Sequence, residues 1–242
     1  IAMGVGLSIG TTSLISNAIG EKKDKKASFF LAQSVILSIL TAIIVTLAGI
    51  YVGPYVIFAM NNSLVILNLS MEYLNIIFLG SILIFIQMSV NSLLTAIGDT
   101  KSNRNILIFS FFLNIFLNPL FIFGYGIIPA MGIKGIALST IVSQFIGVIY
   151  IIYKASRTYL SEYIYPKYFL PNVKILKDLL TQGIPASLGM MMISVGVFII
   201  LFFIGQYGDL AIAGYGTAIR YEQLYLLPVL GLNTAVLAMV GQ

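Results

Sequence analysis

The sequence contains no cysteine and no histidine among its 242 residues. These absences exclude disulfides, thiolate and imidazole chemistry, and the usual protein ligands of zinc, haem and iron–sulfur clusters. Charge is also scarce, because only 9% of the residues are Asp, Glu, Lys or Arg, whereas a soluble domain carries roughly 25%. A water-soluble fold is therefore excluded.

Apolar residues make up 59% of the sequence. They occur in runs that reach the ~20 residues a helix needs to cross the hydrocarbon core of a bilayer. Clusters of Gly, Pro, Asn and charged residues separate these runs, and one predicted break spans Gly53-Pro54 and residues 61–63. The sequence predicts an all-α, integral-membrane, polytopic helical bundle whose partner is the lipid bilayer. About seven helices are expected, at residues 1–19, 27–50, 68–97, 105–123, 133–153, 179–204 and 209–240.

The predicted loops differ sharply in positive charge. The loops near residues 20–26, 98–105 and 154–178 contain nearly all of the Lys and Arg, whereas the alternate loops contain only Lys134. Positive residues are retained on the cytoplasmic side, so these three loops are expected to be cytoplasmic, in a multi-pass protein of the cytoplasmic (plasma) membrane. No nucleic-acid partner is expected, because the basic residues lie in short membrane loops and not on one soluble face.

Two further features concern the organisation of the chain. Aromatic residues alternate with Lys and Pro in the long loop at 154–178, which suits a connector lying along the inner headgroup region. The chain opens on Ile1 inside an apolar run and closes on Gln242 without a polar tail. Both ends are expected to be cuts in a longer protein, whose remainder would be a partner of this part.

Polar residues recur at helical spacing inside several apolar runs. Because a polar side chain in hydrocarbon is costly unless it faces another helix or a wet cavity, such rows predict protected faces. For the Ser and Thr positions, interhelical hydrogen bonding and ligand binding both remain open. The rows are Gln87, Asn91 and Thr95; Ser110, Asn114 and Asn118; Ser139 with Ser143; Thr140 with Gln144; and Ser34 with Ser38.

The row that ends at Asn118 is followed directly by Pro119. Proline supplies no N–H, so the carbonyl of Ile115 loses its helical partner, and Asn118 is predicted to leave helical dihedrals. Two amide oxygens and a freed carbonyl would suit a hard cation such as Na⁺. The alternative is a helix kink satisfied by the neighbouring Asn side chain or by water.

Ionisable residues within the predicted spans are few. Glu72 and Asp209 are expected to reach the membrane interface. Arg220 and Glu222 lie deeper, where an ionisable side chain indicates function, and their partners are expected in the rest of the protein.

The chain resembles the multidrug and toxic compound extrusion (MATE) transporters from their second to their eighth transmembrane helix. The order and spacing of several motifs carry this resemblance. The motifs are Gly6–Gly20 running into Glu21-Lys22-Lys23, Ala96–Lys101, Asn114–Gly124, Gly132–Ala137, Gly183–Leu188, Ala213–Gly216, Leu227-Pro228, Gly231 and Val240–Gln242.

The resemblance implies twelve helices in two six-helix lobes. Residues 1–153 would form most of the N-terminal lobe (helices 2–6), residues 154–178 the cytoplasmic inter-lobe connector, and residues 179–242 the start of the C-terminal lobe (helices 7–8).

The resemblance also implies a cation site in the first lobe. The residues that form this site in relatives correspond to Asn114, Asn118, Thr140 and Asn91 of this sequence. The relatives commonly have Asp where this sequence has Asn118. A neutral amide cannot carry a proton and would bind Na⁺ without the attraction of a carboxylate.

The resulting hypothesis is a cation-coupled antiporter, driven by Na⁺ or H⁺, that exports drugs and other amphipathic or cationic small molecules. Candidate cavity-lining residues are Gln87, Thr95, Ser110, Ser139, Gln144, Met190 and Arg220. Met190, Met191, Met192 and Phe198 would form a soft wall for varied ligands, or simply pack against other helices. No catalytic residue, no cofactor beyond the coupling ion and no metal other than Na⁺ is expected.

Two other functions stay open. A lipid-linked saccharide flippase of the same superfamily would need a basic cavity, and only Arg220 is available for it. An integral-membrane enzyme would have to rely on Ser or Tyr chemistry, because the sequence has no His, no Cys and no clustered carboxylates.

Overall fold

The computed structural model describes residues 2–60, 64–126 and 128–241, and its described part is almost entirely helical. Seven of the described helices are long and apolar enough to cross a membrane, which confirms the expected helical bundle. Two short 3₁₀ helices, η1 and η2, lie between α5 and α6. The elements are α1 Ala2–Gly20, α2 Asp24–Met60, α3 Leu64–Ala96, α4 Thr100–Phe123, α5 Ile133–Ser156, η1 Tyr159–Tyr163, η2 Pro166–Phe169, α6 Val173–Gly205 and α7 Asp209–Gly241.

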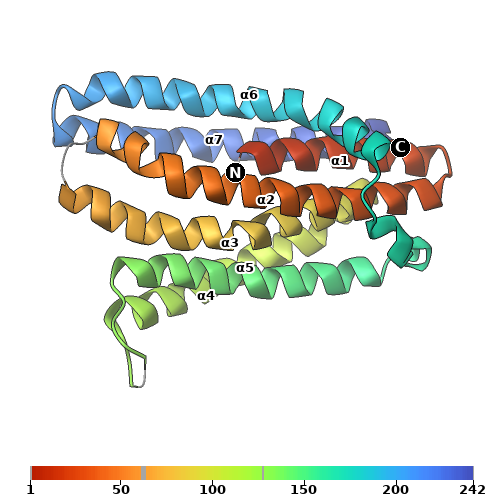
Figure 1. The fold of residues 1–242 in the computed structure, drawn as a ribbon, viewed down its shortest axis with the longest axis horizontal. Helices are drawn as coiled ribbons and strands as arrows, with labels where there is room; N and C mark the ends of the chain where they lie inside the picture. Colours follow the sequence, from red (N-terminus) through yellow and green to blue (C-terminus); the bar gives the residue numbers. More distant parts are fainter. Residues whose placement is uncertain (1, 61–63, 127, 242) are drawn as a thin grey trace.

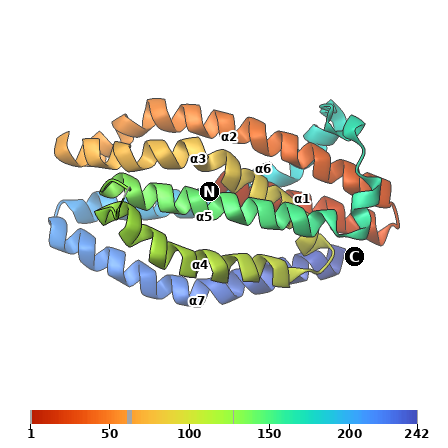
Figure 2. The same ribbon diagram turned by 90° about the horizontal axis from the view of Figure 1, so that it is seen from below.

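The long helices run side by side along the long axis of the molecule (Figures 1 and 2). The α1–α2 turn, the α3–α4 turn and the segment that joins α5 to α6 lie at one end of the bundle, and the α4–α5 and α6–α7 turns lie at the other. The basic loops of the sequence are therefore gathered at one end. Lys134, at the start of α5, lies at the opposite end.

Several predicted helix boundaries are wrong, and those in α2 and α4 are the clearest. The break expected at Gly53-Pro54 does not occur, because α2 continues through Pro54 to Met60; a proline inside a helix removes one hydrogen bond and can bend the helix without ending it. The other part of that break, residues 61–63, lies outside the described residues. Helix α4 begins at Thr100, five residues earlier than expected.

Asp99 explains the early start of α4. Its Oδ1 accepts a hydrogen bond from the Ser102 backbone N–H (3.0 Å), and its Oδ2 accepts one from the Ser102 hydroxyl (2.6 Å), the usual arrangement of an N-cap. Partial burial opposes ionisation of Asp99, but the hydrogen bonds from Ser102 and the charge of Lys154 outweigh it and hold the pKa of Asp99 below its usual range.

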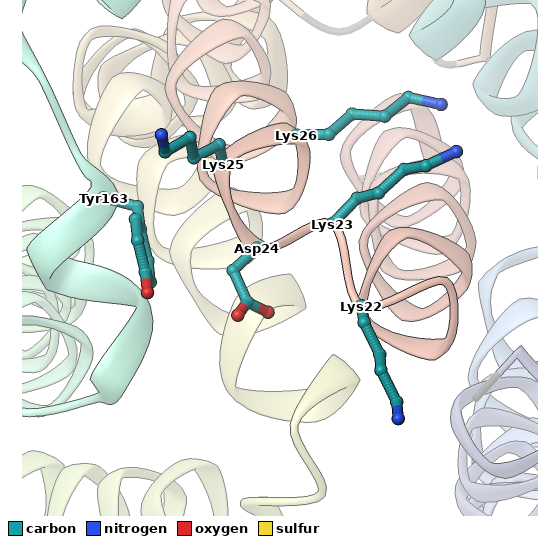
Figure 3. Close-up of a pocket in the computed structure, with 6 residues that line it drawn as sticks. All are labelled: Lys22, Lys23, Asp24, Lys25, Lys26 and Tyr163. Carbon is teal, nitrogen blue, oxygen red and sulfur yellow. The ribbon is translucent and has the colours of Figure 1, made fainter.

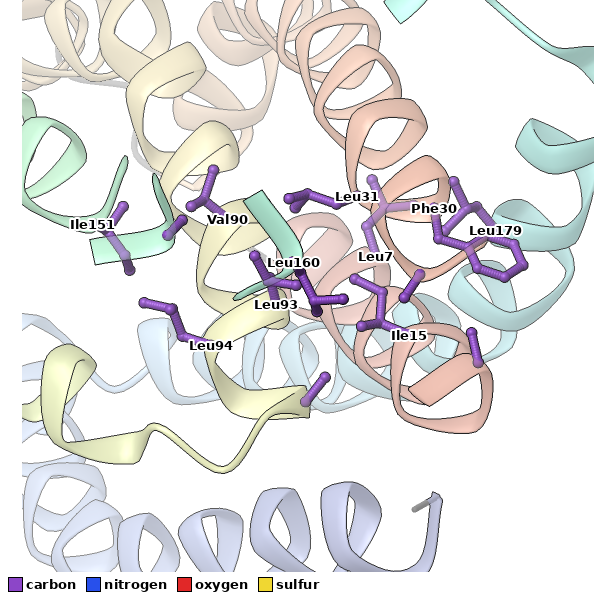
Figure 4. Close-up of a cluster of buried hydrophobic side chains, with 14 of the residues drawn as sticks. Leu7, Ile15, Phe30, Leu31, Val90, Leu93, Leu94, Ile151, Leu160 and Leu179 are labelled. Carbon is purple, nitrogen blue, oxygen red and sulfur yellow. The ribbon is translucent and has the colours of Figure 1, made fainter. Parts of the chain in front are cut away.

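The segment that joins α5 to α6 is shorter than predicted and is packed into the bundle. It covers residues 157–172, because α5 extends to Ser156 and α6 already begins at Val173; we call it the connector. Leu160 of the connector is fully buried in the main apolar cluster, among side chains of α1, α2 and α3 (Figure 4). The Ser28 hydroxyl donates a hydrogen bond to the Leu160 carbonyl (2.9 Å).

Gln33 of α2 fastens the end of the connector. Its side chain is fully buried. Its Nε2 donates to the carbonyls of Tyr168 (2.6 Å) and Leu170 (2.7 Å), and its Oε1 accepts from the backbone N–H of Asn172 (2.8 Å). Asn172 in turn caps α6 by accepting from the N–H of Ile175 (3.2 Å). One buried amide therefore joins α2 to the first turn of α6.

Helices α1 and α6 cross at very short range. A Cβ atom on Gly6 would lie 2.1 Å from Oγ and 2.3 Å from the backbone nitrogen of Ser187, and one on Gly10 would lie 2.8 Å from the nitrogen of Gly183. Two small residues four apart on each helix thus face each other, an arrangement that lets membrane helices approach closely. Only glycine fits at Gly6, because the backbone of the partner occupies the space of a side chain.

We expect Gly6→Ala to destabilise the intact protein by about 1–3 kcal/mol, as overpacking does elsewhere, because Ser187 must move to admit the methyl group. The measurement is the thermal unfolding midpoint in detergent. Gly189→Ala on α6 is the matched control, since nothing lies within 4 Å of its Cβ position. Equal midpoints for the two variants would contradict the close crossing.

Gln33→Leu preserves most of the side-chain volume but removes all three hydrogen bonds to the connector. Each buried group left without a partner costs about 1–3 kcal/mol, so the connector should open and trypsin should cleave after Lys167 at least about tenfold faster. Gln206→Leu, at the exposed end of α6, is the control and should leave the cleavage rate unchanged. An unchanged rate in Gln33→Leu would show that the connector is held by other contacts.

Candidate functional site

The predicted row of amides on α4 meets the serines of α5. Nδ2 of Asn114 donates hydrogen bonds to Ser143 Oγ (3.0 Å) and to the Ser110 carbonyl (2.8 Å). One turn further along α4, Oδ1 of Asn118 accepts from the hydroxyl of Ser139. We call Asn114, Asn118, Ser139 and Ser143 the α4–α5 polar set. It confirms that these residues face a neighbouring helix.

The two serines of this set also contact the backbone of their own helix. Ser139 Oγ lies 2.8 Å from the Ile136 carbonyl, and Ser143 Oγ donates to the Ser139 carbonyl (2.9 Å). The Ser139 hydroxyl hydrogen therefore has two acceptors within reach, the Asn118 amide oxygen and the Ile136 carbonyl. Both serines are buried, at 0% and 2% exposure.

The expected departure of Asn118 from helical geometry is wrong. Helix α4 stays continuous through Pro119 and ends at Phe123. Asn118 is held by Ser139 across the interface, and this contact supports the helical conformation that its proline neighbour disfavours locally. The Asn114 amide donates to Ser110 and Ser143. The bond to Ser143 links α4 to α5, the bond to Ser110 stays within α4, and neither repairs the gap left by Pro119.

Thr140 and Gln144 are not drawn into this set by hydrogen bonds of the described residues. The Thr140 hydroxyl donates to the Ile136 carbonyl of its own helix (3.1 Å). Both side chains are half-buried. Thr140 is adjacent in sequence to Ser139 and so lies near the set on a different side of α5.

Helix α3 contributes buried amide oxygens that have no donor. Oε1 of Gln87 and Oδ1 of Asn91 are buried without a hydrogen-bond partner among the described residues. A Cβ atom on Gly147 of α5 would lie 2.9 Å from Gln87 Oε1, which places Gln87 one turn along α5 from Ser143. No hydrogen bond of the described residues joins Asn91 to the α4–α5 polar set. Thr95, the third residue of the row, is buried at 5% exposure.

Sequence reasoning missed several polar residues of the same interior. Oδ1 of Asn75 and Oγ of Ser16 are also buried without a partner. The hydroxyl of Ser8 on α1 pairs with that of Ser92 on α3 (2.8 Å). The hydroxyl of Ser34, from the predicted row on α2, pairs with that of Ser89 on α3 (2.7 Å). Asn75 lies twelve residues before Gln87, about a third of a turn off the face of that row, so helical spacing alone would not have found it.

No ionisable side chain forms a hydrogen bond with this set among the described residues. Glu72 pairs with Lys134 (3.3 Å) at the end of the bundle opposite the basic loops, in keeping with its expected interfacial place. No group of three or more acidic, His or Cys side chains that could hold a metal occurs among the described residues. The α4–α5 polar set contains only Asn and Ser, so it is neutral. It can offer oxygen atoms to a hard cation but cannot carry a proton.

The candidates on α6 and α7 are not brought to the polar set. Met190 is half-buried, whereas Met191, Met192 and Phe198 are exposed. Arg220 and Glu222 are exposed and form no ion pair with any residue that the structure describes. The side chain of Asp209 lies outside the described residues.

The MatE family model matches residues 1–120 and 185–242. The probable multidrug resistance protein YpnP of Bacillus subtilis (strain 168) is 30% identical over 238 residues, which are 98% of this chain and 52% of the relative.

Two similar solved structures are the inward-facing and the outward-facing conformation of a multidrug resistance MATE family transporter of the MOP superfamily. Against the inward-facing structure the TM-score is 0.83 at 27% identity, over 97% of this chain and 53% of that one. Against the outward-facing structure the TM-score is 0.84 at 27% identity, over 100% and 54%. The chain thus spans about half the length of these relatives.

Proposed function

The chain belongs to the MatE family, and from that premise we propose that it is part of a cation-coupled antiporter exporting drugs and other amphipathic or cationic small molecules. Relatives named as multidrug resistance proteins and transporters, not as enzymes, support the transport class. The observation that carries the coupling proposal is the α4–α5 polar set, a neutral group of amides and hydroxyls between otherwise apolar helices.

The proposal includes the organisation of the whole transporter. Residues 1–153 would belong to the first lobe, residues 154–178 to the inter-lobe connection and residues 179–242 to the second lobe. The basic end of the bundle would face the cytoplasm, because positive loops are retained there. The remainder of the protein would complete the substrate cavity and contribute the partners of Arg220 and Glu222.

The Ser139 hydroxyl provides a simple binding mechanism. When its hydrogen points to Asn118 Oδ1, the amide oxygen is occupied. When the hydrogen turns to the Ile136 carbonyl, 2.8 Å away, both Asn118 Oδ1 and Ser139 Oγ become free to coordinate a cation. Rotation of one hydroxyl would thus exchange an interhelical hydrogen bond for two oxygen ligands of Na⁺. Proton coupling would require a carboxylate from the rest of the protein.

We expect Asn114→Ala and Asn118→Ala to raise the Na⁺ concentration for half-maximal transport by about tenfold, since a lost contact worth about 1.4 kcal/mol is a factor of ten. The assay is uptake of a fluorescent cation into proteoliposomes of the intact protein under imposed Na⁺ or H⁺ gradients. Asn105→Ala is the matched control, because that amide is on the same helix and, among the described residues, accepts a side-chain hydrogen bond from its neighbour Arg104 alone.

Two results would contradict the proposal. Unchanged Na⁺ dependence in both variants would reduce the α4–α5 polar set to helix packing. Transport of a lipid-linked saccharide by the wild type, without any gradient-dependent flux of the cation, would favour a flippase.

Asn118→Asp should make the apparent Na⁺ affinity depend on pH. A carboxylate facing Ser139 adds charge attraction for Na⁺, and it loses that attraction when it takes up a proton. Binding should therefore weaken as the pH falls and the carboxylate takes up a proton, whereas the wild-type site has no group to titrate. The measurement is the half-saturating Na⁺ concentration between about pH 5 and pH 8. Parallel pH profiles for the two proteins would rule out an ion ligand at residue 118.

A further inference from the structure

We propose that the pocket between the α1–α2 turn and the connector binds the phosphate headgroup of an anionic phospholipid. The pocket is a cavity of about 430 Å³ at the basic end of the bundle. This inference concerns the membrane surface and does not depend on the transported substrate or the coupling ion. The lining residues are Lys22, Lys23, Asp24, Lys25, Lys26 and Tyr163 (Figure 3).

Most of the positive charge around this pocket is not neutralised by the protein. Glu21 pairs with Lys23 (2.8 Å), and the Lys26 ammonium lies 5.5 Å from the ring centre of Phe30. Lys22 and Lys25 form no ion pair with any acidic side chain that the structure describes. Asp24 is the single acidic residue among the lining residues. The pocket is thus a concentration of lysines that an anion would stabilise.

Helix electrostatics strengthens this argument. Lys25 and Lys26 lie in the first turn of α2, which begins at Asp24. The N-terminus of a helix is its positive end, where basic side chains are unfavourable and anionic groups are favoured. Lys25 and Lys26 therefore repel each other and this end of the helix dipole. A bound phosphate would offset both unfavourable terms.

The walls of the pocket are held in place on both sides. On one side, the turn adopts a defined conformation, in which Lys22 has a φ of 57° and the Lys23 N–H donates to the Ala18 carbonyl (2.9 Å). On the other side, Leu160 is buried in the core and Gln33 fastens the connector, so the intervening Tyr163 is positioned at the pocket. The backbone on both sides of the pocket is therefore in place before a headgroup binds, and the ordering that remains is that of the exposed lysine side chains.

The position of the pocket favours a phospholipid over free phosphate. It lies at the start of α2, whose exposed apolar side chains begin about four turns further along, with Leu40, Ile43 and Ile44 at 46–61% exposure. Tyr159 and Tyr165 of the connector are also exposed, as is typical of aromatic residues at the headgroup level. A headgroup held by the lysines would leave its acyl chains alongside the apolar face of α2. A free anion would gain nothing from that face.

The test measures lipid binding to the intact, detergent-solubilised protein by thermal-shift titration. The probes are short-chain phosphatidylglycerol, short-chain phosphatidylcholine and inorganic phosphate. The combined substitution Lys22→Gln, Lys25→Gln and Lys26→Gln should weaken phosphatidylglycerol binding by at least about tenfold, because each basic residue near an anionic headgroup contributes measurably. Phosphatidylcholine should bind much more weakly to the wild type.

The matched control is Lys167→Gln, Lys174→Gln and Lys177→Gln, which removes the same charge at the same end of the bundle but outside the pocket. It should change the affinity by less than about twofold. Equal losses in the two triple variants would overturn the proposal in favour of general surface charge. Inorganic phosphate that binds as tightly as phosphatidylglycerol would overturn the assignment to a lipid.

Tyr163→Phe is a second test that remains informative if the lysine variant does not insert or fold. It keeps every charge and removes only the phenol donor. It should weaken phosphatidylglycerol binding by about two- to fivefold, the value of one hydrogen bond, with phosphatidylcholine unaffected. Unchanged phosphatidylglycerol affinity in this variant would show that the connector forms no part of the binding site.

Discussion

Hydrocarbon offers no hydrogen-bond partner to a polar group, and the packing of this bundle follows from that constraint. Its buried hydroxyls and amides bond mainly across helix interfaces, as in Ser34 with Ser89 and Asn118 with Ser139. Among the exceptions, the oxygens of Gln87 and Asn91 lie on one face of α3 and have no donor among the described residues. Because an unsatisfied buried acceptor is costly, this face of α3 is a place where the rest of the protein, water or a cation would contribute binding free energy.

The same constraint explains why the connector is bound so firmly. Backbone groups outside a helix need partners, and Gln33 supplies three of them from inside α2. Asn172, one of these partners, is the N-cap of α6. Further along α6, the close crossing at Gly6 and Gly10 packs the helix against α1. The first half of α6 is thereby joined to the helices of the proposed first lobe at two separate levels.

Much of the fold, but less of the site, follows from the sequence. Apolar runs gave seven helices because each run must cover the hydrocarbon, and loop charge separated the two ends of the bundle. The continuation of α2 through Pro54 was missed. Proline locally favours the end of a helix, but in an apolar environment the remaining backbone hydrogen bonds keep the helix continuous. The cap at Asp99 could have been recognised from Ser102 three residues later. The contacts of Gln33 could not, because its partners lie 135–139 residues away.

An amide at residue 118, and not a carboxylate, is consistent with its surroundings. A charged group between α4 and α5 would have to be paired or hydrated, whereas the partners present are the Ser139 hydroxyl and backbone carbonyls. A neutral amide meets these neighbours without the cost of burying a charge. For the proposed cation site, the consequence would be a low cost when the site is empty and a modest attraction when it is filled. The Na⁺ affinity of this proposed site would therefore depend on its oxygen ligands. It would not depend on the protonation of any residue in the α4–α5 polar set.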